Sequence, residues 1–296
     1  MQLALPESPL AAMPSLYVVA TPLGNLHDIS FRALALLKTV GTVAAEDTRH
    51  SQRLLDAFGI RTKLLALHEH NEQSAAGQLI KLLEAGEHVA LITDAGTPAV
   101  SDPGARAVAR VQEAGFPVVP VPGACAAIAA LSASGLADGA FHFHGFLPTR
   151  SAARRAQLEA MQGIPGTLVF YEAPHRIAEC LADLAQVFTE GRQIVVAREL
   201  TKMFEQIARM PLAEAPAWLA ADPNRSRGEF VLLVSAAPPT EGVSAEAERV
   251  LKLLLNELPI KKAARMAAEI TGAPKNALYE LGLALRKADE GGDGDD

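Results

Sequence analysis

Short apolar runs alternate along the first part of the chain with segments in which apolar residues recur every three or four positions. The apolar runs are continuous, which is typical of strands buried on both faces of a parallel sheet. They read LYVVA, GTVAAE, KLLALHE, HVALIT and FPVVPV, and the helical segments between them include FRALALLKTV and ARAVARVQEAG. The pattern predicts an α/β domain with a parallel sheet over residues 14–125.

A second group of apolar runs follows the alanine-rich helical segment ACAAIAALSASG. Its members read FHFHGF, TLVFYEA, QIVVAREL and EFVLLVSA, again with helical spacing between them. We interpret residues 126–238 as a second α/β domain with its own sheet.

Beyond AAPPTEG the pattern becomes purely helical, and we expect a helical domain over residues 244–287. Gly272 is placed to end the second of three helices, and Pro274 can open the third. Two interpretations stay open, a helix-turn-helix whose second helix begins at Lys275, and a small helical cap packed on the second domain. The acidic residues that follow predict a disordered tail at 288–296.

The composition of the chain bears on its net charge, its cellular compartment and its relation to membranes. The formal charge of the 296 residues is −7, but five acids fall in the final DEGGDGDD, so the rest of the chain is nearly balanced. The two cysteines form no disulfide framework, which favours a reducing cytoplasm. No apolar run approaches the roughly 18 residues that span a bilayer. The start, MQLALPESPLAAMP, carries no basic residue and is unlike a signal peptide, so we expect no membrane association.

Three loops rich in proline and glycine follow strands of the first domain, ATPLGNLHD, DAGTPAVSDPG and VPGACAA. Glycine lets a ligand approach backbone amides, and proline reduces the entropy that a loop loses on binding. Each loop alone could be an ordinary turn, but carboxyl ends of parallel strands meet at one edge of a sheet, where ligands bind. The three together predict a ligand crevice. The ordinary dinucleotide and P-loop fingerprints are absent.

The motifs TPLGNLHDIS, AEDTRHSQRLL, DAGTPAVSDPG, VPGACA, YEAPHR, ARELTKMFE and GEFVLLV occur in this order between Thr21 and Val234. Together they resemble the tetrapyrrole methylase superfamily, and within it the branch that methylates the ribose 2′-oxygen of a decoding-centre cytidine in 16S rRNA. The resemblance implies a class III methyltransferase whose two α/β domains form a cofactor cleft, with S-adenosylmethionine as methyl donor. It also implies 16S rRNA as substrate, either free or in the small ribosomal subunit, and a homodimer.

The resemblance further implies which residues contact the cofactor. Gly96, Thr97 and Pro98 would line it, since bare amides suit a carboxylate and apolar walls suit adenine. The other expected contacts are Leu23, Val100, Cys125 and Ala126 from the first domain and Ala173, Leu200 and Thr201 from the second. Cys125 is interpreted as a packing residue, because no base lies beside it in the sequence.

Methyl transfer to a hydroxyl also needs a group that accepts its proton. The polar candidates near the expected cleft are Asp47, Asp94, Asp102, Glu172, His175, Glu199 and Glu229. Glu172 ranks first because it ends a strand that faces the crevice, and Asp47 and Glu229 follow. Asp102 precedes a proline and is expected to cap the next helix.

An RNA substrate requires cations. The candidates are Arg49 and Arg53 on one helix face, Arg150, His175, Arg176, Arg198 and Lys202 in the second domain, and Lys261, Lys262 and Lys275 in the helical tail. Arg154 and Arg155 are interpreted as a solvated helix face. His68, His70 and Asn71 lack a second ligand cluster, so we expect no metal site.

Two rival functions remain open at this point. One is a methyltransferase on the same fold that acts on a tetrapyrrole or another small molecule. The other is a DNA-binding regulator without turnover, in which the α/β part senses a ligand and the helical tail reads duplex DNA.

Overall fold

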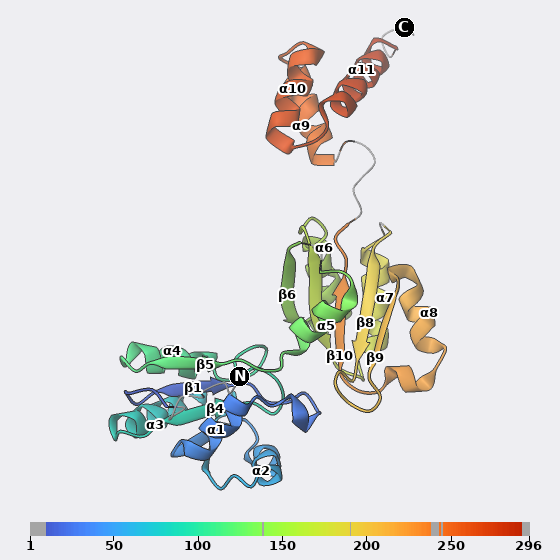
Figure 1. Ribbon diagram of the computed structural model, residues 1–296. Helices are drawn as coiled ribbons and strands as arrows, with labels where there is room; N and C mark the ends of the chain where they lie inside the picture. The colour runs from blue at the N-terminus through green and yellow to red at the C-terminus, as the bar shows by residue number, and fades with distance from the viewer. Residues whose placement is uncertain (1–9, 138, 190, 238–242, 244, 292–296) are drawn as a thin grey trace, which may run out of the picture. The chain divides into compact units, whose positions relative to one another are not determined.

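The computed structural model describes residues 10–291, except 138, 190, 238–242 and 244. The chain divides into two compact units, Met1–Ala236 and Ala237–Asp296. The first unit contains two five-stranded sheets with their helices, and the second is helical (Figure 1). The start of the chain and residues 292–296 of the predicted acidic tail lie outside the described residues.

The first sheet is entirely parallel, with strand order β3-β2-β4-β1-β5. Its strands are β1 (Leu16–Val19), β2 (Thr42–Ala45), β3 (Lys63–Ala66), β4 (Val89–Ile92) and β5 (Val118–Val121). The central strands β2 and β4 are buried along their whole length, as their continuous apolar runs predicted. The predicted parallel sheet is confirmed.

Four α-helices connect these strands, namely α1 (Phe31–Thr39), α2 (Thr48–Ala57), α3 (Glu72–Glu84) and α4 (Ala105–Glu113). Side chains cap the first two, since Ser30 accepts from the backbone N–H of Ala33 and Asp47 accepts from that of Arg49. Apolar clusters pack on both faces of the sheet, with α1 in one cluster and α3 and α4 in the other. The helices thus cover the faces, which leaves the carboxyl ends of the strands to the loops.

The second sheet is mixed, with strand order β6-β7-β10-β8-β9. Its strands are β6 (Phe141–Phe146), β7 (Thr167–Glu172), β8 (Gln193–Arg198), β9 (Gln206–Pro211) and β10 (Phe230–Val234). Only β6 and β7 run parallel. The edge strand β9 was not among the strands expected from the sequence, because QIARMP carries polar side chains where the other runs are apolar.

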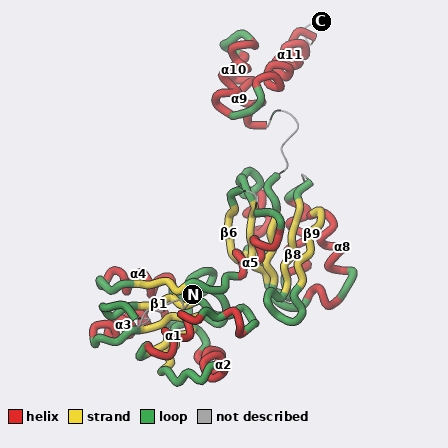
Figure 2. The backbone as a smooth tube through the Cα atoms, viewed as in Figure 1, coloured by secondary structure: helices red, strands yellow, loops and turns green. Residues whose placement is uncertain are grey.

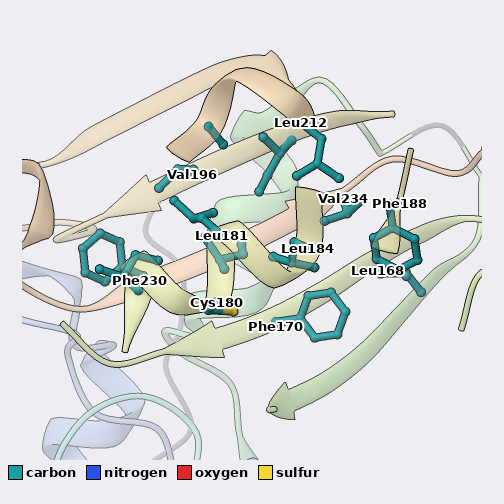
Figure 3. Packing of buried hydrophobic residues seen from close by; sticks show 14 of the residues in the cluster. Leu168, Phe170, Cys180, Leu181, Leu184, Phe188, Val196, Leu212, Phe230 and Val234 are labelled. Carbon is teal, nitrogen blue, oxygen red and sulfur yellow. The ribbon is translucent and has the colours of Figure 1, made fainter. Parts of the chain in front are cut away.

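Helices α6 (Ser151–Ala160), α7 (Ile177–Val187) and α8 (Ala215–Ala220) contribute to the core on one face of this sheet. Figure 3 shows Leu181 and Leu184 of α7 among side chains of the strands, including Phe170. Arg154 does not lie on a solvated face as expected. It is fully buried, and its Nε lies 2.6 Å from a carboxylate oxygen of Asp183. A buried charge of this kind needs a partner, and Asp183 supplies it.

The opposite face of the second sheet packs against α5 (Ala126–Ser134), the alanine-rich segment. The remaining short helices are the 3₁₀ segments η1 (Leu26–Asp28), η2 (Leu212–Glu214) and η3 (Pro223–Ser226). Figure 2 shows loops joining these elements at the ends of the strands.

The second unit is built from α9 (Ala245–Leu255), α10 (Ile260–Thr271) and α11 (Lys275–Gly291). Gly272 ends α10 in the left-handed conformation at φ 73°, as predicted. Ala264, Leu251 and Leu278 are fully buried in a core that the three helices share. The last helix runs four residues past the predicted end at Lys287. Among the described residues, no helix has the length and apolar content needed to cross a bilayer.

Candidate functional site

Two of the proline-glycine loops are joined to each other by backbone hydrogen bonds. Strands β1 and β4 are neighbours, and just beyond them Thr21 and Gly96 form an isolated antiparallel bridge, with N···O distances of 2.8 and 3.0 Å. The Thr97 hydroxyl donates to the carbonyl of Ala124, which connects the third loop. The three loops predicted to form a crevice are therefore one connected surface.

This surface borders a cavity of about 440 Å³ in the first unit, between the loops of the first sheet and the ends of strands in the second. Its lining is Leu23, Glu46, Asp94, Ala95, Gly96, Thr97, Val100, Ser101, Asp102, Cys125 and Ala126 from the first group, and Phe146, Tyr171, Glu172, Ala173, Pro174, Leu200, Glu229, Phe230 and Val231 from the second.

Most residues expected at the cofactor site line this cavity. They are Leu23, Gly96, Thr97, Val100, Cys125, Ala126, Ala173 and Leu200. Pro98 is buried within its loop and Thr201 follows the lining residue Leu200, and neither residue lines the cavity. Of the candidate proton acceptors, Asp94, Asp102, Glu172 and Glu229 line the cavity, whereas Asp47, His175 and Glu199 do not.

The β4–α4 loop holds an unusual backbone conformation where it borders the cavity. Gly96 has φ 85°, and the non-glycine residues Ala99 and Ser101 have φ 67° and 64°. Left-handed conformations cost free energy in residues other than glycine, and they persist where surrounding contacts enforce them. A Cβ at Gly96 would lie 3.4 Å from Leu23, so the backbone itself forms the cavity wall here.

The expectation that Asp102 caps the following helix is wrong. Helix α4 begins after Gly104, whose φ is 123°, and its amides are capped by a residue distant in sequence. The Glu72 carboxylate accepts hydrogen bonds from the backbone N–H groups of Gly104, Arg106 and Ala107, at 3.0, 2.8 and 3.3 Å. Asp102 is thereby left free to line the cavity.

The environment of Asp102 favours the protonated acid. Burial raises its pKa from 3.8 to about 6, and the carboxylates of Glu46 and Asp94 add to this, while a hydrogen bond with Thr93 opposes it. These residues follow the adjacent strands β2 and β4, whose carboxyl ends meet at one edge. A half-buried carboxyl group with a pKa near 6 is suited to accept a proton near neutral pH.

Glu172, unlike Asp102, lies beside a cation and accepts a backbone hydrogen bond. Its side chain is fully buried, Oε1 accepts from the backbone N–H of Ala173 at 2.8 Å, and the same oxygen lies 3.1 Å from Nε of Arg176. The guanidinium of Arg176 also donates to the carbonyl oxygens of Leu147 and Pro148. The pair is thus built into the end of β7, and Arg176 is only 14% exposed.

Lys202 and Arg198, expected to contact RNA, are also engaged within the protein. Lys202 Nζ lies 2.9 Å from carboxylate oxygens of both Glu199 and Glu229. The Arg198 guanidinium donates to the carbonyl oxygens of Asn224 and Arg227. The contacts of these cations hold the loops beside the cavity.

The remaining RNA-contact candidates lie on the surface. Arg49 is 89% exposed and pairs with Asp47, lowering the pKa of that carboxyl through hydrogen bonds. Arg53, Arg150 and His175 are exposed. In the second unit Lys261, Lys262 and Lys275 are exposed as well. Among the described residues, no group of three or more histidine, cysteine or acidic side chains forms a possible metal site.

An aromatic wall, which the sequence pattern did not predict, lines the cavity on the side of the second sheet. Tyr171 lines the cavity with its hydroxyl 3.1 Å from the backbone N–H of Ala127, and its ring packs edge-on against Phe143 and Phe146. Burial, with a contribution from the nearby Cys125, raises the pKa of Tyr171 far above its usual value. The only sequence signal was a run of aromatic residues interrupted by glycine in FHFHGF.

The lining of the cavity suits a cofactor with a positive charge and an apolar ring. Asp94 and Glu46 can face a positive charge, and Leu23, Val100 and Leu200 provide apolar walls. The backbone N–H and carbonyl of Gly96 are bonded to Thr21 and fix the loop at the cavity. The loops at the carboxyl ends of the parallel sheet share this cavity with the second, mixed sheet. This arrangement defines an α/β enzyme that binds a small-molecule cofactor.

The comparisons with known proteins identify its family. Residues 15–216 match the family described as tetrapyrrole (corrin/porphyrin) methylases, and residues 241–286 match the RsmI C-terminal HTH domain. The chain belongs to the tetrapyrrole methylase family. The predictions of a methyltransferase and of S-adenosylmethionine as its methyl donor are confirmed at the level of this family. The helix-turn-helix interpretation of the tail is confirmed too.

Relatives extend along nearly the whole chain. It is 58% identical over 272 residues to the ribosomal RNA small subunit methyltransferase I of Pseudomonas aeruginosa, covering 91% of this chain and 96% of that one. The protein of the same name from Escherichia coli O157:H7 is 51% identical, covering 90% and 94%.

Solved structures share the fold at lower identity. A cobalt precorrin-4 methyltransferase superposes with a TM-score of 0.56 at 19% identity, covering 76% of this chain and 96% of that one. A Thermus thermophilus uroporphyrin-III C-methyl transferase, complexed with S-adenyl homocysteine, gives 0.54 at 19% identity, covering 75% and 98%.

Proposed function

We propose that this protein transfers the methyl group of S-adenosylmethionine to the ribose 2′-oxygen of a decoding-centre cytidine, cytidine 1402, in 16S rRNA. The observation that carries the proposal is the extent of the similarity. Relatives named as ribosomal RNA small subunit methyltransferases match 90–91% of the chain at 51–58% identity, and the helical unit matches the corresponding C-terminal domain.

The cavity supplies what the transfer requires. The donor brings a methyl group on a good leaving group, so the protein has to hold the donor, orient the 2′-hydroxyl and take up its proton. Loop residues around Gly96 and the apolar residues Leu23, Val100 and Leu200 would hold the donor. Asp102 would accept the proton, because it lines the cavity, forms no ion pair with another described residue and has a pKa near 6.

The alternative candidate, Glu172, is held at the end of β7. Its Oε1 lies 3.1 Å from Nε of Arg176 and accepts from the backbone N–H of Ala173, while its buried Oε2 has no hydrogen-bond partner among the described residues. We assign Glu172 to fixing the end of β7 at the cavity, because its Oε1 joins the strand to both Ala173 and Arg176. Asp47 is bound to Arg49 away from the lining, and Glu229 shares Lys202 with Glu199.

Contacts with rRNA would come from exposed cations outside the cavity. In the first unit these are Arg49, Arg53, Arg150 and His175, and in the helical unit Lys261, Lys262 and Lys275. We include a homodimer, which the family resemblance implies, and a cytoplasmic location, which the lack of a disulfide framework favours. Nucleic-acid contact through phosphates predicts a strong dependence of affinity on salt concentration.

Methylation of a tetrapyrrole or another small molecule is the second candidate function. The fold favours it equally, since solved structures of a cobalt precorrin-4 methyltransferase and of uroporphyrin-III C-methyltransferase superpose with TM-scores of 0.53–0.56. Those matches cover 75–76% of the chain, whereas the rRNA-methyltransferase relatives cover 90–91%. The enzyme names of the relatives speak against a DNA-binding regulator without turnover.

The deciding experiment measures transfer of labelled methyl from S-adenosylmethionine to small ribosomal subunits that lack the modification, followed by nucleoside mapping. The expected product is one 2′-O-methylcytidine. Parallel reactions contain free 16S rRNA or uroporphyrinogen. Labelled porphyrinoid with unlabelled rRNA would overturn the proposal in favour of the small-molecule enzyme.

A further inference from the structure

Strand β6 contains a bulge beside the cavity. Phe143 pairs with Val169 of β7, but the next paired residue is Gly145, opposite Phe170, and Phe146 then lies opposite Tyr171. His144 is therefore the extra residue in β6. Bulges commonly occur next to active sites, where they redirect a side chain.

The bulge decides which face of the sheet carries Phe146. Without it, strict alternation would place Phe143 and Phe146 on opposite faces, because they lie three positions apart. With it, both lie on the face of Tyr171, whose ring centroid is 5.0 Å from that of Phe143 and 5.8 Å from that of Phe146. His144 lies instead near Phe170, which belongs to the core on the other face.

The ring of Phe146 lines the cavity, and the residue is 51% exposed to solvent. An exposed phenylalanine loses the free energy that burial of its ring would provide. The wall behind it is fixed, because the Tyr171 hydroxyl accepts a hydrogen bond from the N–H of Ala127 on helix α5. A rigid, half-exposed aromatic face at a cavity is suited to receive a flat ligand.

A close contact between Gly145 and Ser101 brings β6 next to the loop that carries the proposed proton acceptor, Asp102. Gly145 has φ 77°, and a Cβ there would lie 2.7 Å from the Ser101 hydroxyl. Phe146 and Asp102 are the next residues on the two sides of this contact, and both line the cavity. Tyr171, on whose ring Phe146 packs, lines the same cavity.

We propose that Phe146 stacks on the base of the target nucleotide and so positions its ribose for methyl transfer. The inference rests on the proposed RNA substrate and deepens it. A target nucleotide that leaves the RNA stack to bring its ribose into the cavity loses the stacking of its base, and an aromatic surface at the cavity can replace that stacking. Aromatic side chains perform this task in proteins that bind single-stranded RNA.

The test compares Phe146→Ala with a control on the same strand. Phe141 is 42% exposed at the other end of β6 and does not line the cavity, so Phe141→Ala removes an exposed ring of the same kind. Methylation of unmodified small subunits is measured under single-turnover conditions, and donor affinity is measured by calorimetry. We expect Phe146→Ala to lose roughly 5- to 150-fold in kcat/KM, the range observed for loss of one stacked base. Phe141→Ala should be unchanged.

Further variants separate stacking from bulk. Phe146→Trp should retain activity and Phe146→Leu should not, because leucine is apolar but has no aromatic face. Full activity in Phe146→Leu would overturn the stacking role. The role would also be overturned if Phe146→Ala lost as much donor affinity as it lost kcat/KM, because the ring would then belong to the cofactor site. A wild-type protein that methylates porphyrinogen and not rRNA would overturn the proposed function itself. If the wild type methylates rRNA and Phe146→Ala does so equally well, only the inference about Phe146 is overturned.

Discussion

Glu72 occupies the capping position at helix α4 that the sequence assigns to Asp102. Its carboxylate binds three backbone N–H groups at the start of the helix, although it lies 32 to 35 residues away in the chain. Asp102, which precedes Pro103 as a capping residue would, instead lines the cavity with a pKa raised to about 6. Because Asp102 does not cap the helix, its carboxyl group is available to accept a proton.

Asp102→Asn should therefore slow methyl transfer by about 10²- to 10⁴-fold with donor affinity retained, because the amide cannot take up the hydroxyl proton. In the wild type the single-turnover rate should fall as pH drops below about 6, where Asp102 becomes protonated. Glu46, Asp94 and Tyr171 surround this group and are unchanged in the variant. A rate close to that of the wild type would exclude Asp102 as the acceptor.

The same substitution should raise stability near neutral pH. Because the pKa of Asp102 is higher in the folded state than its ordinary value of 3.8, ionisation costs the folded protein stability as pH rises from about 4 to about 6. The melting temperature of Asp102→Asn should exceed that of the wild type at pH 7, and the difference should vanish toward pH 4. A constant difference across this range would show that burial of the charge is not the cause.

Glu172→Gln should act mainly on stability. Removing the carboxylate leaves the largely buried Arg176 without its partner, and breaking a buried pair typically costs about 3–5 kcal/mol. Denaturant unfolding measures this loss, and the single-turnover rate of the folded variant should fall much less than the effect expected for a general base. A loss of about 10²-fold or more in rate with normal stability would return Glu172 to the role of acceptor that the sequence favoured.

Gly96→Val should weaken binding of S-adenosylmethionine by placing a branched side chain on the cavity wall beside Leu23. The backbone penalty has to be separated from this effect, because Gly96 has φ 85°. Gly86→Val is the matched control, since Gly86 has φ 88° and an added Cβ would meet no described atom within 4 Å. Calorimetry should show weaker binding only for Gly96→Val. Equal losses would place the ligand elsewhere.

Neutralising the exposed lysines Lys261, Lys262 and Lys275 to glutamine should weaken binding to small subunits and flatten its salt dependence. The logarithmic slope should fall by about 0.7 for each phosphate that a lysine no longer neutralises. Donor binding should not change. Lys252→Gln is the control, because Lys252 already pairs with Glu248 at 2.7 Å. An unchanged slope in the triple variant would show that these lysines do not bind the RNA.

The sequence by itself determined the local elements and their order. Continuous apolar runs predicted β2 and β4, the position of Gly272 predicted the end of α10, and three proline-glycine loops predicted the crevice, because each depends on residues close together in the chain. Its motifs were enough to indicate the family. Eight of the cofactor contacts that the family resemblance implied line the cavity.

Only the tertiary structure decided what each polar or aromatic side chain does there. Arg154 looked like a solvated cation until packing placed Asp183, 29 residues away in the chain, beside it. The cap at α4 came from a distant helix, and a one-residue bulge turned Phe146 toward the cavity. Periodicity reports which face of an element is apolar, whereas a partner's distance and the charge it imposes arise from contacts between segments that the chain keeps far apart.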